Sequence, residues 1–259
     1  MEKRAPRTAI EYFNSLGVEL FYYRLTDSTN KRAREYSSDA PTLPALFLSD
    51  GQTEGRGRMG RSFFSPDYTG LYMTLLIDAP GHRSFTLLTS VAAVAVRDAV
   101  SRIFGVETGI KWVNDIYLGS KKIAGILAES FVWGEKRYVA IGVGVNLTTR
   151  DFPAELVDKA GAILDFDMEQ EELDAVRFGL AFEITRGILD MLKDQTGSHI
   201  DRYRQYSCVI GKRVSFVSGD SQLEGVALDI GKDGELEVLL DSGERRVLSS
   251  GEISLRLYD

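Results

Sequence analysis

One segment constrains the fold more than any other part of the sequence: GQTEGRGRMGRSFFSP, from Gly51 to Pro66. It fits the dinucleotide fingerprint G-x-G-x-x-G. It also fits the phosphate loop G-x-x-x-x-G-K-[ST], except that Arg61 replaces the lysine. Both motifs require a helix directly after the glycines, because the helix N-terminus binds the phosphate. Pro66 and Gly70 would interrupt any such helix. The sequence therefore argues against both motifs and predicts a Gly/Arg loop between two strands.

The flanking segments and the charges support this interpretation. Ala45 to Asp50 and Leu71 to Asp78 are short and apolar, as strands are. Arg56, Arg58 and Arg61 form a cationic cluster in a chain whose net charge is -7. Guanidinium groups and backbone N–H donors suit phosphate or carboxylate ligands. We predict a mobile loop that closes over an anion.

Composition limits the class of protein. The chain has 259 residues, 44% hydrophobic and 27% charged, which is typical of a globular protein of one or two domains. Its only cysteine, Cys208, excludes an internal disulfide. The sequence contains no signal-peptide core and no apolar run of membrane length, so we predict a cytoplasmic location. The negative net charge predicts no general attraction to DNA or to a membrane.

The segment from Gly109 to Ser130 is typical of a β-hairpin. It contains two strand-like runs, 110–118 and 122–130, joined by Gly119 and Ser120. Alternation in the first run would place Lys111, Val113 and Asp115 on one face, and Trp112 and Asn114 on the other.

Three glycines lie inside the predicted strands that follow. Gly125 lies in the second run of the hairpin, and Gly142 and Gly144 share a face of a third strand, Tyr138 to Leu147. For each glycine alone, packing is at least as good an explanation as a ligand. Together they suggest a flat small molecule lying against the sheet.

The rest of the chain has the pattern of a scaffold. Ser84 to Gly105 and residues 171–193 have apolar residues at helical spacing. From Gly211 onward, short strand-like runs alternate with turns, which predicts a small β-barrel. The sequence thus predicts an α+β fold, with a mixed sheet backed by helices and a second β module.

Four motifs in order carry a specific resemblance. They resemble the motif series of biotin protein ligases: the early DSTN, GRGRMGR followed by SP, KWVND followed by KIAGIL, and GVGVN. The resemblance spans most of the first 150 residues. Val113 stands where the family often has proline, which we interpret as a tolerated strand variation. The resemblance implies a catalytic domain over residues 1–208, similar to class II aminoacyl-tRNA synthetases, and an SH3-like β-barrel over 209–259.

The resemblance also implies a two-step reaction. Biotin and Mg-ATP would give biotinyl-5′-AMP, and a lysine of a biotin carboxyl carrier protein would then take the biotinyl group. Two anions must meet in the first step, so cations and positioning matter more than a covalent nucleophile. His82 and His199 have no motif context, and no spacing suggests bound metal, so no metal ligands are predicted.

Individual roles follow from the matched motifs. The residues implied on the biotin side are Ser28, Thr29, Asn30, Gln52, Arg56, Gly57, Arg58, Lys122 and Gly125. The residues implied on the ATP or adenylate side are Arg58, Arg61, Trp112, Asn114, Lys122 and Asn146. The implied catalytic residues are Lys122, Arg58, Lys111 and Asp115. Asp115 fits a structural carboxylate equally well, Trp112 fits a core residue, and DSTN also fits a helix N-cap.

Three alternatives stay open at this point. A lipoate or octanoate ligase is disfavoured, because that family lacks the GRGRxGR loop. A biotin-sensing repressor is disfavoured because too few residues precede Asp27 for a DNA-binding domain. A pure binding module is the third. A homodimer is compatible with the sequence.

Overall fold

The computed structural model describes residues 5–37, 41–79, 85–194, 196–219 and 221–255. The helices are α1 (Arg7–Ser15), α2 (Thr29–Tyr36), α3 (Phe85–Phe104), α4 (Gln170–Lys193) and α5 (Ser198–Tyr206), with a 3-10 turn η1 (Arg58–Gly60). The strands of the first sheet are β1 (Glu19–Thr26), β2 (Ala45–Gln52), β3 (Gly70–Asp78), β4 (Gly109–Lys111), β5 (Asp115–Leu118), β6 (Lys121–Trp133) and β7 (Lys136–Asn146). Those of the second are β8 (Arg213–Ser218), β9 (Ser221–Ile230), β10 (Leu236–Leu240), β11 (Arg245–Leu248) and β12 (Ile253–Leu255).

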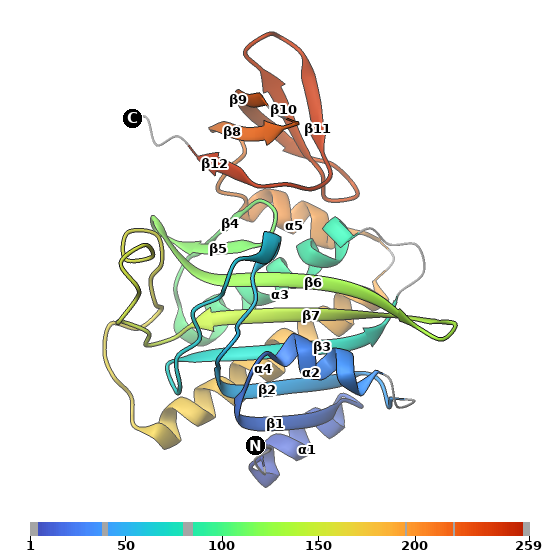
Figure 1. Ribbon diagram of the computed structural model, residues 1–259, viewed down its shortest axis with the longest axis vertical. Helices are drawn as coiled ribbons and strands as arrows, with labels where there is room; N and C mark the ends of the chain where they lie inside the picture. The colour runs from blue at the N-terminus through green and yellow to red at the C-terminus, as the bar shows by residue number, and fades with distance from the viewer. Residues whose placement is uncertain (1–4, 38–40, 80–84, 195, 220, 256–259) are drawn as a thin grey trace.

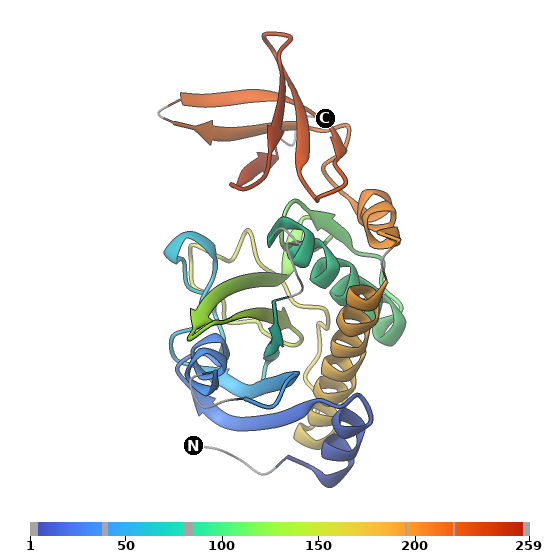
Figure 2. The same ribbon diagram turned by 90° about the vertical axis from the view of Figure 1, so that its right-hand side faces the viewer.

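The large sheet has the order β1-β2-β3-β7-β6-β5-β4 and is covered on both faces (Figure 1). It is mixed, because β1 and β2 are parallel and the other described pairs are antiparallel. Helices α1, α3 and α4 lie on one face and α2 on the other (Figure 2). Strand alternation explains the two layers: Leu46 and Leu48 belong to the main core, and Phe47 packs with Ala33 of α2. The predicted α+β class is confirmed.

The long helices match the predicted spacing. In α4, Leu173, Leu180, Ile184 and Ile188 are buried. Helix α3 begins at Phe85, and Ser84, like His82, lies outside the described residues. The strands on either side of the Gly/Arg loop are confirmed as β2 and β3.

The predicted hairpin is partly wrong. Residues 110–118 do not form one strand, because β4 and β5 are themselves antiparallel, with Lys111 opposite Asp115. The three residues between them form a turn, so the predicted alternation fails there and Val113 is not in a strand. Tertiary contacts hold the turn: the Tyr203 hydroxyl donates to the Val113 carbonyl (3.2 Å) and the Ile126 N–H donates to the Asn114 carbonyl (2.9 Å).

The second sheet, β11-β10-β9-β8-β12, is antiparallel and fits the predicted SH3-like module. It lies at the β4–β5 side of the large sheet (Figure 1). The Trp112 indole donates to the Gly234 carbonyl (2.9 Å), and the Thr86 hydroxyl donates to the Ser249 carbonyl (2.6 Å). Within the described residues, no helix is long and apolar enough to cross a membrane.

Candidate active site

The DSTN motif begins α2 and meets the end of β2. Ser28 occupies the N-cap position of α2, as predicted. Its side chain, however, makes no capping hydrogen bond. Ser28, Thr29 and Asn30 are buried. The Thr29 N–H donates to the Gln52 side-chain carbonyl (2.8 Å), whose amide nitrogen donates to the Ser65 hydroxyl (3.1 Å). The structure thus brings the predicted residues of α2 and Gln52 into one polar cluster.

Two residues that sequence reasoning missed complete this cluster. The Asn30 amide donates to Glu129 of β6 (2.6 Å), and the Thr74 hydroxyl of β3 lies 2.6 Å from the Asn30 carbonyl oxygen. Thr74 is fully buried. Its hydroxyl in an otherwise apolar strand was the available signal, since a buried polar group needs a partner. Glu129 carried no comparable signal.

The Gly/Arg loop has a defined stem and an exposed tip. The Phe63 N–H donates to the Gly55 carbonyl (2.8 Å), and the Gly57 N–H donates to the Arg61 carbonyl (2.7 Å). Met59 at the tip adopts a left-handed conformation (φ 54°) and is 76% exposed. Arg56 is exposed on the stem. This geometry carries the arginines and several backbone groups across the face of the sheet formed by β6 and β7.

Cations and their partners converge beside the loop. The Lys122 ammonium pairs with Asp115 at 2.6 Å, and Arg58 donates to the Asn114 side-chain carbonyl at 3.2 Å. Asn114 also donates to the Ile126 carbonyl (2.8 Å), which ties Arg58 to β6. The structure therefore brings four predicted residues from three motifs together. The Lys111 ammonium lies 5.5 Å from the centre of the Tyr117 ring.

The second sheet contributes a carboxylate. Arg61 forms a bidentate ion pair with Glu252, in which both N–O distances are 2.5 Å. Burial alone would raise the pKa of Glu252, but the hydrogen bond and charge of Arg61, with the charges of Lys111 and Arg58, lower it. Glu252 therefore lies in the field of the predicted cations. No sequence signal distinguished it from other surface carboxylates.

The three glycines have packing roles. A Cβ atom on Gly142 would lie 2.2 Å from the Asn30 side-chain oxygen, and one on Gly144 would lie 2.4 Å from the Phe63 ring. A Cβ atom on Gly125 would lie 3.3 Å from the same ring and 3.1 Å from the Lys122 ammonium. The space that the sequence assigns to a flat ligand is thus filled by Asn30 and Phe63. A ligand lying against β6 and β7 requires Phe63 to move.

A small cavity lies beside β6, next to Arg58 of the loop. Its volume is about 110 Å³, and its lining comes from the Gly/Arg loop, α3, β6 and the segment between β11 and β12, including Arg58, Thr86, Leu127 and Ser249. Pockets for small ligands typically measure about 300–1,000 Å³. The cavity must therefore widen to admit a ligand of that size.

Two predicted nucleotide-side residues are buried. Trp112 is 3% exposed and packs between the two sheets, where its N–H donates to Gly234. The Asn146 amide donates to the Gly161 carbonyl (3.0 Å), while its own side-chain carbonyl is buried without a hydrogen bond. Contact of either residue with a nucleotide stays a prediction. Among the described residues, no three His, Cys, Asp or Glu side chains cluster as metal ligands would.

The chain is similar to known proteins over most of its length. The profile described as the biotin/lipoate A/B protein ligase family matches residues 22–146, and the one described as the biotin protein ligase C terminal domain matches 209–256. The biotin–[acetyl-CoA-carboxylase] ligase of Mycobacterium tuberculosis is 30% identical over 237 residues, covering 88% of this chain and 85% of that protein. The bifunctional ligase/repressor BirA of Bacillus subtilis is 30% identical over 240 residues, covering 91% and 74%. The structure of the biotin protein ligase from Aquifex aeolicus in complex with biotin and ATP matches with a TM-score of 0.75 at 25% identity, covering 92% and 98%.

Proposed function

The chain belongs to the biotin protein ligases of the biotin/lipoate A/B protein ligase family, and we propose that it activates biotin with ATP and transfers it to a carrier protein. The observation that carries this proposal is the meeting of two unlike surfaces on one face of the sheet. The polar cluster of buried Thr29 and Asn30 with half-buried Gln52 suits an uncharged ureido ring. Next to it, Arg58 and Lys122 suit a carboxylate and a phosphate.

In the first step, a biotin carboxylate oxygen attacks the α-phosphorus of ATP. A new P–O bond forms, and the bond to pyrophosphate breaks. Lys122 and Arg58 stabilise the negative charge that gathers on the phosphoryl and carboxyl oxygens. Asp115 holds the Lys122 ammonium in place through their 2.6 Å ion pair. Magnesium enters with ATP as part of the substrate.

In the second step, the amine of a carrier lysine attacks the biotinyl carbonyl. A C–N bond forms, the bond from the carbonyl carbon to the AMP oxygen breaks, AMP leaves, and the amine gives its proton to solvent. We propose a biotin carboxyl carrier protein as acceptor, a cytoplasmic location, a domain boundary at residues 208 and 209, and a possible homodimer.

Biotin-dependent exchange between ATP and labelled pyrophosphate tests the first step. The purified chain should catalyse exchange with biotin and not with lipoate or octanoate. Exchange with lipoate alone would instead identify the alternative ligase. Biotin binding with no exchange would identify a binding module or a sensor.

We expect ligand to order the Gly/Arg loop. The cavity is too small for biotin and Phe63 covers the glycines, so residues 55–62 must rearrange when the adenylate forms. Hydrogen exchange of these amides should slow when biotin and ATP are added together. Residues of α4 far from the site serve as the internal reference. Equal exchange at 55–62 with and without both ligands would contradict the prediction.

A further inference from the structure

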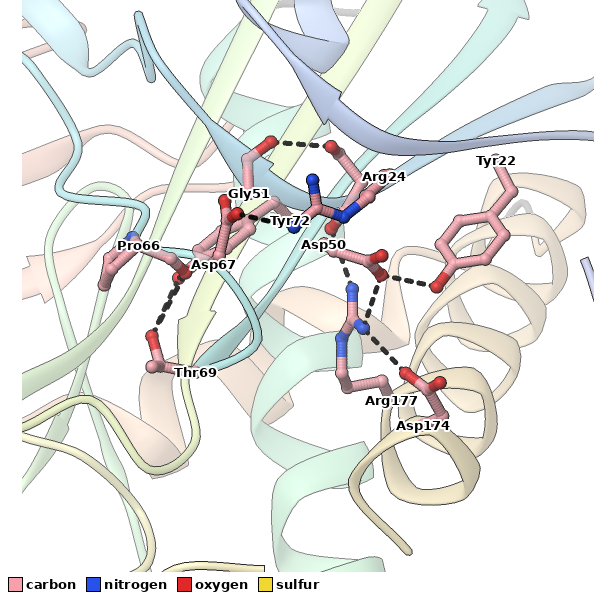
Figure 3. A network of polar contacts seen from close by, with 11 residues as sticks. Tyr22, Arg24, Asp50, Gly51, Pro66, Asp67, Thr69, Tyr72, Asp174 and Arg177 are labelled. Carbon is pink, nitrogen blue, oxygen red and sulfur yellow. Dashed lines mark hydrogen bonds and ion pairs between the residues drawn. The ribbon is translucent and has the colours of Figure 1, made fainter. Parts of the chain in front are cut away.

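A buried ion-pair network lies between the sheet and α4 (Figure 3). Arg177 of α4 reaches the end of β2, where one guanidinium nitrogen lies 2.7 Å from Asp50 and 2.9 Å from Asp174. The other nitrogen donates to the Ser49 carbonyl at 2.8 Å. The side chain of Arg177 is 3% exposed and that of Asp50 is fully buried. The Tyr22 hydroxyl of β1 also donates to Asp50.

This network holds the short stretch of β2 from which the candidate site extends. The Asp50 carbonyl accepts a hydrogen bond from the Tyr68 N–H (3.0 Å), and the Gln52 N–H donates to the Ser65 carbonyl (3.0 Å). The outgoing and returning ends of the Gly/Arg loop are therefore both attached to residues 50–52. Any shift of this strand end moves the Gln52 side chain and the loop together.

We propose that Arg177 and Asp50 are positioning residues for biotin, acting from the opposite face of the sheet. Arg177 fixes the backbone at Ser49 and Asp50, and this sets where Gln52 meets Thr29 at the biotin side of the site. Neither Arg177 nor Asp50 touches substrate. The inference rests on the proposed function.

The chemistry of the pair favours positioning over simple stabilisation. A buried ion pair often contributes no more to stability than apolar residues of similar volume, because both charges lose their hydration. A planar guanidinium, however, directs several hydrogen bonds at fixed angles, which apolar packing cannot do. Burial alone would lower the pKa of Arg177, but the charge and hydrogen bond of Asp50 raise it, so the guanidinium stays charged. The network thus fixes both the distance and the angle between α4 and the end of β2.

An apolar replacement of the three buried members of the network separates the two roles. In the variant Tyr22→Phe, Asp50→Leu and Arg177→Met, no buried charge of the pair is left without a partner, so we expect a melting temperature close to that of wild type. Biotin-dependent pyrophosphate exchange should show a KM for biotin raised roughly ten- to hundredfold, since small misplacements cost that much. The KM for ATP should change much less. A folded variant with an unchanged biotin KM, or with both KM values raised equally, would overturn the proposal.

A milder variant covers the case in which the triple variant fails to fold. Arg177→Lys keeps the charge, but a single ammonium group cannot replace the two guanidinium nitrogens that bind Asp50 and the Ser49 carbonyl. It should raise the biotin KM by a smaller factor at a nearly unchanged melting temperature, and no rise would overturn the proposal. Arg186→Met removes a half-exposed ion pair with Glu183 on the same helix and serves as the control. Wild-type protein without biotin-dependent exchange would overturn the proposed function itself.

Discussion

Lys122→Ala is expected to remove most biotin-dependent pyrophosphate exchange while the melting temperature stays close to that of wild type. Lys122 lies beside Gly125 and pairs with Asp115, at the place where carboxylate and α-phosphate would meet. Its charge would stabilise the transition state more than either bound reactant. Loss of such a donor typically costs about 2.7–4 kcal/mol, or a roughly hundred- to thousandfold lower rate. Because the Lys122 side chain is 31% exposed, its removal leaves no large cavity.

The neighbouring lysine provides the matched control. Lys121 carries the same charge, but its ammonium donates to the Val157 carbonyl at an exposed position (2.8 Å). Lys121→Ala should exchange like wild type. If both alanine variants exchange at the wild-type rate, Lys122 is a surface charge and its assigned role is wrong. If Lys122→Ala lowers the melting temperature strongly, the ion pair with Asp115 is structural.

The parts of the fold that sequence could predict depend on local pattern. The apolar runs around the loop, the helical spacing in α4 and the short runs after Gly211 each contain their own evidence, because burial on one face follows strand or helix period. All of them formed the predicted elements. The candidate site was less predictable, because local pattern could not show which distant residues meet. DSTN, the Gly/Arg loop and KIAGIL lie far apart in sequence, and only the motif resemblance indicated that they meet.

The turn at Trp112 to Asn114 shows where local pattern fails. The stretch contains no glycine or proline and has strand-like residues, and the one local sign of a turn is the Asn114-Asp115 pair. Distant groups decide it: the Tyr203 hydroxyl donates to the Val113 carbonyl, and the Gly234 carbonyl between β9 and β10 accepts the Trp112 indole N–H. Such contacts override propensity.

Contacts between distant residues were also beyond prediction. Arg177 and Asp50 are separated by 127 residues, and Arg61 and Glu252 by 191. An arginine in an amphipathic helix normally faces water, so Arg177 gave no sign of its burial. No role was predicted for Phe63, and only the three-dimensional structure places its ring on Gly144.

The face of the sheet at Gly125 offers the sharpest test of where biotin binds. A valine at Gly142 or Gly144 would displace Asn30 or Phe63, because a Cβ atom there comes within 2.2 or 2.4 Å of them. At Gly125 the closest contacts are 3.1–3.3 Å, to the end of the flexible Lys122 side chain and to the Phe63 ring. These neighbours can yield by a few tenths of an ångström, and valine suits a strand. Gly125→Val should therefore fold and still narrow the space against the sheet.

We expect the folded Gly125→Val variant to bind biotin roughly ten- to a hundredfold more weakly than wild type. Forcing extra methyl groups into an occupied space typically costs about 1–3 kcal/mol, and about 1.4 kcal/mol is tenfold in affinity. Calorimetric titration with biotin measures the loss, and circular dichroism with a thermal melt verifies the fold. Ser130→Val, an exposed site on the same strand, controls for the added valine and should bind like wild type. Because the glycine's neighbours include Lys122 and Phe63, unchanged biotin affinity in folded Gly125→Val would place the biotin pocket away from the face that these residues share.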